Sequence, residues 1–268
     1  MQGPKTLLEY EDNWVTAMGA FFPGERVVFR GKDLFHELKY LGWMALLLYG
    51  ITGRIPSEKQ VKLFEGLWKF STSYPDPRLW NNRVAALAGT TRSTAALAIS
   101  AATAISEASI YGLRPNVRAI DFYIKTQAQL EKGAILAELI EEEIKRNKVI
   151  DSFGRPIINH DERIAPIISL AEKLGVADGK HIKLAFAIEE ILLKQQKNIC
   201  MNVVAVQAAL AADQGFSPLE YCEYKVISFS AGIFPCYTDT QTKPEGSFFP
   251  LRCEKIQYEG KKRRIWNT

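Results

Sequence analysis

The stretch from Trp80 to Gly112 constrains the fold more than any other part of this chain. It is dominated by Ala, Ser, Thr, Leu and Ile, and after Thr91 it contains no proline or glycine before Gly112. Alanine is the strongest helix former, and a glycine suits the position just after a helix. Because small side chains let neighbouring helices approach closely, we expect this stretch to be the buried central helix of an all-α protein.

The same stretch is apolar enough to raise the alternative of a membrane span. Arg92, Glu107 and the many hydroxyl groups argue against it, since such groups are costly in hydrocarbon. The opening sequence MQGPKTLLEYEDNW also lacks the basic-then-apolar pattern of a signal peptide. The four cysteines form no CxxC pair. We therefore expect a cytoplasmic protein with free thiols and no membrane partner.

The charge and the histidine content argue against a nucleic-acid-binding protein and against a zinc site. The chain has 34 Lys and Arg against 30 Asp and Glu, a net charge of +4 that is too small and dispersed for a nucleic-acid-binding protein. The one basic run, residues 261–264, is interpreted as a solvated tail. With only 3 histidines and no paired cysteines, the sequence has no zinc-type spacing, and no metal site is predicted.

Cap and turn signals predict further helices. Ser57 with Gln60, and Ser217 with Glu220, have the spacing of capping boxes. Leu113 to Asn116 is expected to interrupt the helices, and the chain after Gly232 is expected to form a loop. A short strand is expected at 27–29. In the first half of the chain, helices are expected at 33–40 and 42–49, from 57, and from 119 on through 144. In the second half, they are expected at 164–174, 180–194 and 203–213, and from 217 to about 231.

The order and lengths of these expected elements suggest two helical domains. We expect a large helical domain formed by residues 1–150 together with 236–268, and a small helical domain formed by 151–235. A cleft between two such domains is the default place for a ligand.

Six short motifs follow one another along the chain at residues 30–38, 43–56, 83–90, 153–163, 202–216 and 250–260. In order and spacing they resemble the motifs of the citrate synthase superfamily, including its short citryl-CoA-lyase-like members. That family condenses acetyl-CoA with oxaloacetate or cleaves citryl-CoA. The resemblance implies a citrate-synthase-like all-α fold and a homodimer. It also implies a coenzyme A thioester as substrate, with no permanently bound cofactor.

The same resemblance implies where catalytic groups belong, and the chain departs from the family there. Tyr111 stands in place of the histidine that faces the thioester oxygen. Arg155 replaces the histidine on the keto carbonyl, and Val204 replaces the aspartate base. Ser73 or Tyr74 occupies the place of an early substrate-binding histidine. Because valine accepts no proton, the usual base is missing.

Tyr111 and Arg155 are the candidate catalytic residues. A tyrosine hydroxyl can donate to an oxyanion, and an arginine can polarise a carbonyl; Tyr111 can equally be an amphipathic residue at a helix end. His160 and Glu107 are secondary candidates for an acid or base. The alternative for His160 is a solvated partner of the two acids that follow it. Glu107 would have a raised pKa if buried, or would pair with an arginine.

Arg163, Arg252 and Arg83 match arginines of the family and are the candidate substrate-binding residues. A guanidinium grips a carboxylate through two parallel hydrogen bonds. The alternative for each is an ion pair with a helix carboxylate, and the sequence does not separate the two.

Two functions follow from these residues. The first is an enzyme of the acyltransferase or lyase type with a non-standard site, which handles an acyl-CoA and a small carboxylate and forms or cleaves a carbon–carbon bond. The second is a catalytically inactive homologue that binds a metabolite or pairs with an active subunit. The lost base favours the second function, and the polar replacements at Tyr111 and Arg155 favour the first.

Overall fold

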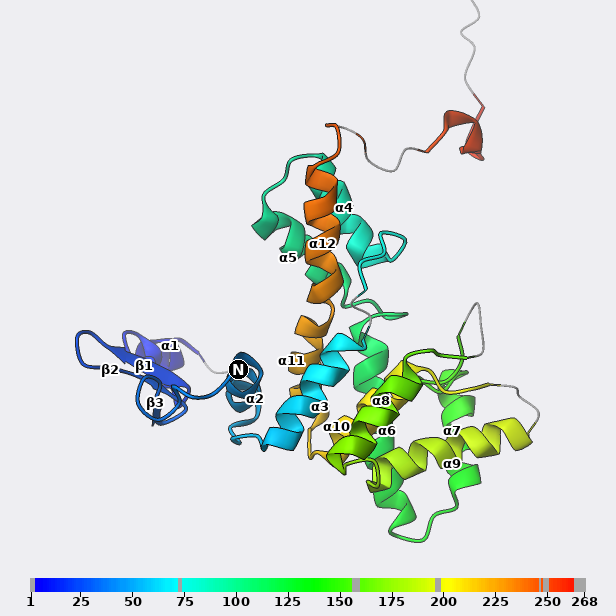
Figure 1. Ribbon diagram of the computed structural model, residues 1–268, viewed down its shortest axis with the longest axis horizontal. Coiled ribbons are helices and arrows are strands. Elements are labelled where there is room, and N and C mark those ends of the chain that lie inside the picture. Colours follow the sequence, from blue (N-terminus) through cyan, green and yellow to red (C-terminus); the bar gives the residue numbers. More distant parts are fainter. Residues whose placement is uncertain are drawn as a thin grey trace, which may run out of the picture. The chain divides into compact units, whose positions relative to one another are not determined.

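The computed structural model describes residues 3–71, 74–155, 160–195, 199–245, 247 and 251–262. The described chain is mostly helical, with one small sheet (Figure 1), so the predicted all-α class is confirmed. Its contacts group into two compact units, Met1–Ser71 with Ala108–Ser228, and Thr72–Glu107 with Phe229–Thr268. This grouping differs from the division expected at residues 150 and 235, which stays a prediction.

The first unit opens with α1 (Pro4–Tyr10) and an antiparallel sheet of β1 (Gly19–Phe22), β2 (Arg26–Phe29) and β3 (Lys32–Asp33). The strand expected at 27–29 is confirmed. The helix expected from Asp33 is wrong. The Asp33 carboxylate accepts hydrogen bonds from the backbone N–H groups of Phe35 and His36. Aspartate closes turns in this way, so the side chain fixes a local turn instead of capping a helix.

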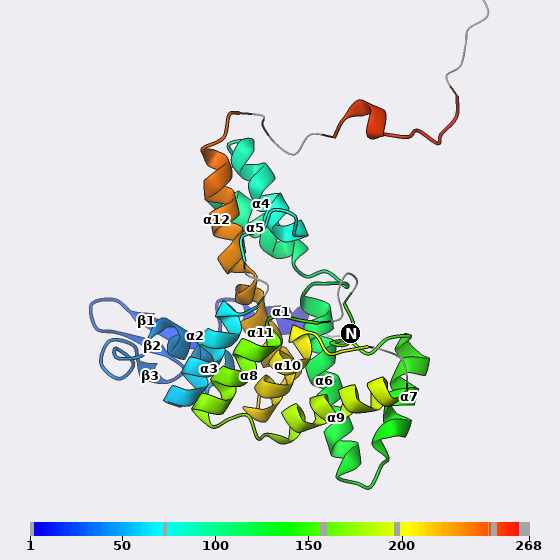
Figure 2. The ribbon, with the colours of Figure 1, turned by 45° about the vertical axis from the view of Figure 1, so that its right-hand side comes forward.

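The first unit contains a helix, α10 (Val203–Asp213), that is buried along almost its whole length. Alanines at 205, 208, 209, 211 and 212 let α6, α8 and α9 pack against it (Figure 2). The buried helix of small residues is therefore α10 and not the stretch from Trp80 to Gly112. The helices of this unit are α2 (Trp43–Thr52), α3 (Glu58–Lys69), α6 (Leu113–Leu130), α7 (Leu136–Asn147), α8 (Ile164–Leu174), α9 (Lys180–Lys194), α10 (Val203–Asp213) and α11 (Pro218–Ser228).

The second unit packs α4 (Trp80–Thr90) and α5 (Ala95–Ile105) with α12 (Ser230–Gln241), and η1 (Cys253–Lys255) follows. The single helix expected over Trp80–Gly112 is wrong, because the chain breaks between α4 and α5. Arg92 adopts a left-handed φ of 58° there. Its guanidinium donates to the carbonyls of Gln241, at 2.9 Å, and Lys243, at 2.7 Å. These contacts stabilise a break that the local sequence does not signal.

Two prolines lie inside helices that the sequence did not predict. Pro115 was expected to interrupt the chain, but it lies in the first turn of α6, where a missing N–H group breaks no helical hydrogen bond. Pro235 lies within α12, where a loop was expected. Other signals are confirmed: the Ser57 and Ser217 capping boxes form, and α8, α9 and α10 have the predicted bounds. Among the described residues, no helix is both long and apolar enough to span a membrane.

Candidate functional site

The candidate site is organised around Asp161, which is only 1% exposed. Its Oδ1 accepts a hydrogen bond from Nε of Arg163, and its Oδ2 accepts one from Nη2 of Arg163, both at 2.8 Å. Oδ2 also accepts the backbone N–H of Val203, the first residue of α10, at 2.8 Å. Because Arg163 is the residue just before α8, one carboxylate ties together the starts of α8 and α10.

The charge state of this pair follows from its contacts. Burial alone raises the pKa of the Asp161 carboxyl, but the hydrogen bonds and positive charge of Arg163, with the Val203 N–H, outweigh burial and hold that pKa below its ordinary value. Asp161 is therefore ionised at neutral pH. Arg163 forms an ion pair with this carboxylate, which was the alternative to its binding a ligand.

Arg155 approaches the same cluster. Its Nη1 donates to the backbone carbonyl of His160 at 2.7 Å and to Oε2 of Glu162 at 2.8 Å, and lies 3.8 Å from Oδ1 of Asp161. The hydrogen bond from Arg155 lowers the pKa of Glu162. The structure thus brings three predicted residues, Arg155, His160 and Arg163, around two carboxylates that the sequence analysis treated only as neighbours of His160.

Backbone pairing fixes the loop that presents Arg155. The N–H of Gly154 donates to the carbonyl of Cys200 at 2.7 Å, and the Asn202 side chain donates to the carbonyl of Gly154 at 3.0 Å. Gly154 has a φ of 83°, a left-handed conformation that glycine adopts without strain. Arg155 is therefore anchored, through its preceding residue, to the segment that leads into α10.

A pocket of about 530 Å³ opens beside this cluster, between α8 and α9. Its wall is mainly apolar. Glu189 is fixed there because its Oε1 accepts the N–H of Met201 at 2.8 Å. Such a pocket suits an extended, partly apolar ligand. The lining residues are His160, Asp161, Ile164, Ala165, Ile168, Ser169, Glu172, Phe186, Glu189, Cys200 and Met201.

Tyr111 lies in the loop between α5 and α6, immediately before the N-cap residue Gly112. Its side chain is 61% exposed, and its φ is 62°. A bulky residue in the left-handed region costs about 1–2 kcal/mol, so the loop holds Tyr111 under strain. The Asn116 side chain, which donates to the Gly112 carbonyl at 2.8 Å, helps to fix this bend. Strained exposed residues of this kind cluster at functional sites.

Three predicted residues belong to the second unit. Nε of Arg83 donates to the Pro77 carbonyl at 3.2 Å. Arg252 is exposed, and its Nη1 lies 3.8 Å from Oε1 of Glu254. Glu107 is exposed in the turn after α5, so the burial on which its role as a base depended is not found. Ser73, Pro250, Arg263 and Arg264 lie outside the described residues.

Val204, at the position of the expected base, is half-buried on α10, and its N–H donates to the Asn202 side chain at 2.9 Å. Across the described ranges, no three His, Cys, Asp or Glu side chains are grouped so that they could hold a metal ion. A buried lysine that the sequence did not signal is Lys225 on α11, which is 2% exposed. Its only signal is position, since Tyr221, Tyr224 and Ser228 share the buried face of that helix.

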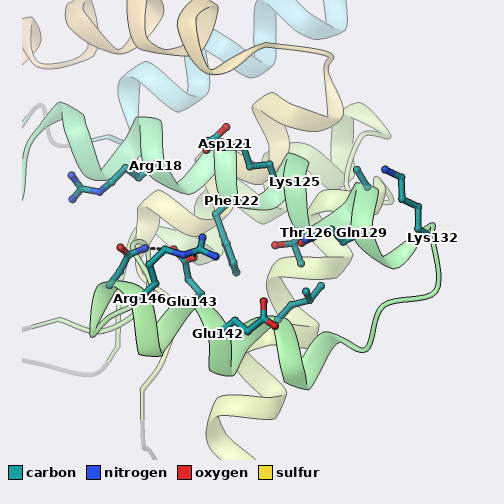
Figure 3. A pocket seen from close by; sticks show the side chains of 13 residues that line it. Arg118, Asp121, Phe122, Lys125, Thr126, Gln129, Lys132, Glu142, Glu143 and Arg146 are labelled. Atoms are coloured by element: carbon teal, nitrogen blue, oxygen red, sulfur yellow. Dashed lines mark hydrogen bonds and ion pairs between the residues drawn. The ribbon is translucent and has the colours of Figure 1, made fainter.

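A second pocket of about 430 Å³ lies between α6 and α7 (Figure 3). It contains none of the predicted site residues. Four of its charged residues pair with one another, since Lys125 pairs with Asp121 and Arg146 pairs with Glu143.

Comparison with solved structures identifies the fold. Citryl-CoA lyase from Hydrogenobacter thermophilus superposes with a TM-score of 0.82 at 18% identity, over 95% of this chain and 98% of that chain. ATP citrate lyase from Methanothrix soehngenii, solved with citrate and coenzyme A, gives 0.77 at 17% identity, over 97% of this chain but 45% of its own. Citrate synthase from Thermoplasma acidophilum gives 0.63 at 17% identity, over 85% of this chain and 59% of that chain.

The chain thus has the citrate-synthase-like fold that its motifs predicted, and it spans less than half of the ATP citrate lyase chain. Sequence comparison finds no matching protein family and no matching curated protein. Identities of 17–18% establish the fold alone, because different chemistries recur on one scaffold.

Proposed function

We propose that this protein binds an acyl-CoA together with a small carboxylate and forms or cleaves a carbon–carbon bond between them. The observation that carries the proposal is the pocket of about 530 Å³ beside the Asp161 cluster. The fold around this pocket is the one that citryl-CoA lyase uses. The ATP citrate lyase structure of the same fold holds citrate and coenzyme A. A coenzyme A thioester is thus the substrate class that these features favour.

Each predicted residue has a role in this reaction that its side chain can perform. The Tyr111 hydroxyl donates to the oxygen of the thioester as negative charge develops on it. Arg155 polarises the carbonyl of the second substrate. Arg163 holds a carboxylate group of the same substrate, for which a guanidinium has the matching geometry. The thioester is consumed or released in each turnover, and no permanent cofactor is required.

The alternative is a catalytically inactive homologue that binds a metabolite or pairs with an active subunit. Two observations favour it. Val204 offers no proton acceptor at the position of the family's base. Arg163 already shares its charge with buried Asp161, which leaves less attraction for a substrate carboxylate.

Calorimetric titration of the pure protein with coenzyme A, acetyl-CoA and oxaloacetate, each alone, tests this proposal. We expect acetyl-CoA to bind, and oxaloacetate to bind about tenfold more weakly to Arg155→Gln than to the wild type, a loss of about 1.4 kcal/mol. The matched control is Arg146→Gln, because Arg146 is exposed on α7 and pairs with Glu143, three residues earlier on the same helix. Binding of oxaloacetate without any coenzyme A derivative would support the alternative. No binding of either class contradicts both.

A further inference from the structure

The pocket beside the Asp161 cluster presents an apolar surface that the residue roles above leave unused. Its large apolar side chains are Ile164 and Ile168 on α8, Phe186 on α9, and Met201. Phe186 is 43% exposed, so much of its ring faces open space. Transferring an apolar group from water onto such a surface is favourable in proportion to the area that is buried. The pocket is therefore suited to an apolar part of a ligand.

The charged residues of the same pocket are acidic. Asp161, Glu172 and Glu189 line it, whereas no lysine or arginine is found among the described residues of its wall. Arg163 compensates the charge of Asp161, but Glu172 and Glu189 form no ion pair with a residue that the structure describes. Because like charges repel, the second carboxylate of a dicarboxylic acid such as oxaloacetate is disfavoured in this pocket.

One end of the pocket adjoins the candidate catalytic residue Arg155. His160 and Asp161 line the pocket, and both also contact Arg155. Nη1 of Arg155 donates to the His160 carbonyl at 2.7 Å and lies 3.8 Å from Oδ1 of Asp161. A substrate whose carbonyl group is polarised by Arg155 thus has its side chain beside the pocket. The volume of about 530 Å³ lies in the range of roughly 300–1,000 Å³ that holds drug-sized ligands, and exceeds what a four-carbon acid fills.

We propose that the second substrate is a 2-oxo acid with an apolar side chain and not a dicarboxylic acid, an inference that rests on the function proposed above. Its single carboxylate is held by Arg163, and its 2-oxo group faces Arg155. Its side chain enters the pocket and packs against Ile168 and Phe186. The acidic residues of the pocket then contribute to specificity, because they disfavour a substrate that carries a second carboxylate.

Calorimetric titration of the pure protein with pyruvate, 2-oxobutanoate, 2-oxopentanoate, 2-oxohexanoate and oxaloacetate tests this inference. The affinity is expected to rise about fourfold with each added methylene group. 2-Oxohexanoate is expected to bind more tightly than oxaloacetate. Phe186→Ala should weaken the binding of 2-oxohexanoate about tenfold and leave that of pyruvate unchanged, because only the longer chain reaches the ring. Glu172→Lys, which reverses an exposed charge, should strengthen the binding of oxaloacetate about threefold.

The matched control is Leu193→Ala, because Leu193 lies on α9 like Phe186, is 44% exposed and is not part of the pocket wall, so the whole series should bind unchanged. Tighter binding of oxaloacetate than of 2-oxohexanoate to the wild type overturns the inference and leaves the proposed function intact. A chain-length dependence found instead with acetyl-, butyryl- and hexanoyl-CoA, and lost in Phe186→Ala, also overturns it, because the pocket then receives the acyl group. A protein that binds no 2-oxo acid and no acyl-CoA overturns both.

Discussion

Among single residues, Asp161 decides how the candidate site is held. It accepts two hydrogen bonds from the Arg163 guanidinium and one from the start of α10 while nearly fully buried. Removing one partner of a buried ion pair leaves the other charge uncompensated, and this usually costs more than the pair contributes. Arg155 depends on the same residue, because its Nη1 lies beside that carboxylate.

We therefore predict that Asp161→Ala lowers the free energy of unfolding at pH 7 by about 3 kcal/mol or more. The measurement is urea unfolding followed by circular dichroism. The control, Asp121→Ala, removes an exposed carboxylate paired with Lys125 one helical turn away, and should cost less than about 1 kcal/mol. Equal losses in the two variants would show that the Asp161 pair contributes no more than a surface ion pair.

The same residue predicts a pH dependence. Because the pKa of Asp161 is lower in the folded than in the unfolded protein, its contribution is fully present above the unfolded value of about 4. It is lost as pH falls through the lower, folded value. We therefore expect the stability difference between wild type and Asp161→Ala to be constant from pH 5 to 7 and to shrink below about pH 4. A difference that grows on acidification would contradict this assignment.

Two substitutions of Tyr111 distinguish the effect of its backbone strain on stability from the effect of its hydroxyl group on turnover. Tyr111→Phe keeps the left-handed backbone but removes the hydroxyl, and because the side chain is exposed we expect stability within about 0.5 kcal/mol of wild type. Tyr111→Gly relieves the strain, so unfolding should cost the same or up to about 1 kcal/mol more. Both should lower turnover of an acyl-CoA about 100-fold, because both remove the oxyanion donor. Wild-type turnover in the phenylalanine variant would remove Tyr111 from the mechanism.

At the level of elements, the packing of α4 on α12 depends on Gly89. A Cβ placed there would lie 2.2 Å from Oγ1 of Thr240 and 2.6 Å from the Tyr237 carbonyl. The backbone carbonyl cannot move without shifting α12, so we predict that Gly89→Ala lowers the free energy of unfolding by about 1–3 kcal/mol. Thermal unfolding followed by circular dichroism measures it. The control is Gly42→Ala, where the added Cβ meets nothing within 4 Å; the two variants should not shift the transition equally.

Elements whose ends are encoded locally were predictable. The capping boxes at Ser57 and Ser217, and the glycine after α8, mark their helices because the capping atoms lie within three residues of each other in sequence. The break at Arg92 was not predictable, because the carbonyls that stabilise it belong to residues 149 and 151 positions away. The helix around Pro235 was missed because proline argues against helix locally, whereas packing of α12 on α4 compensates for it.

The candidate site was predictable to a similar degree. The resemblance supplied Arg155 and Arg163, and the structure places both at one carboxylate. It did not supply Asp161 as the centre of the cluster, because the hydrogen bond that the Val203 N–H donates to Asp161 appears only when the starts of α8 and α10 meet. Lys225 was missed for the same reason: burial is a property of packing, and a lysine on a helix is usually solvated.

For the whole molecule, we expect a homodimer, as the resemblance implies. Sedimentation velocity at micromolar concentration should give a mass near twice the chain mass of 30.2 kDa. A species of one chain mass at all concentrations tested would contradict the prediction.

A mass-spectrometric assay of turnover in both directions tests whether this protein forms or cleaves a carbon–carbon bond. The pure protein is incubated with citryl-CoA, and separately with acetyl-CoA and a panel of 2-oxo acids, and the coenzyme A products are identified. We expect a new or broken carbon–carbon bond in at least one mixture, with less product from Tyr111→Phe and from Arg155→Gln than from the wild type. Binding without any such product would contradict this expectation and leave the inactive, metabolite-binding homologue as the function.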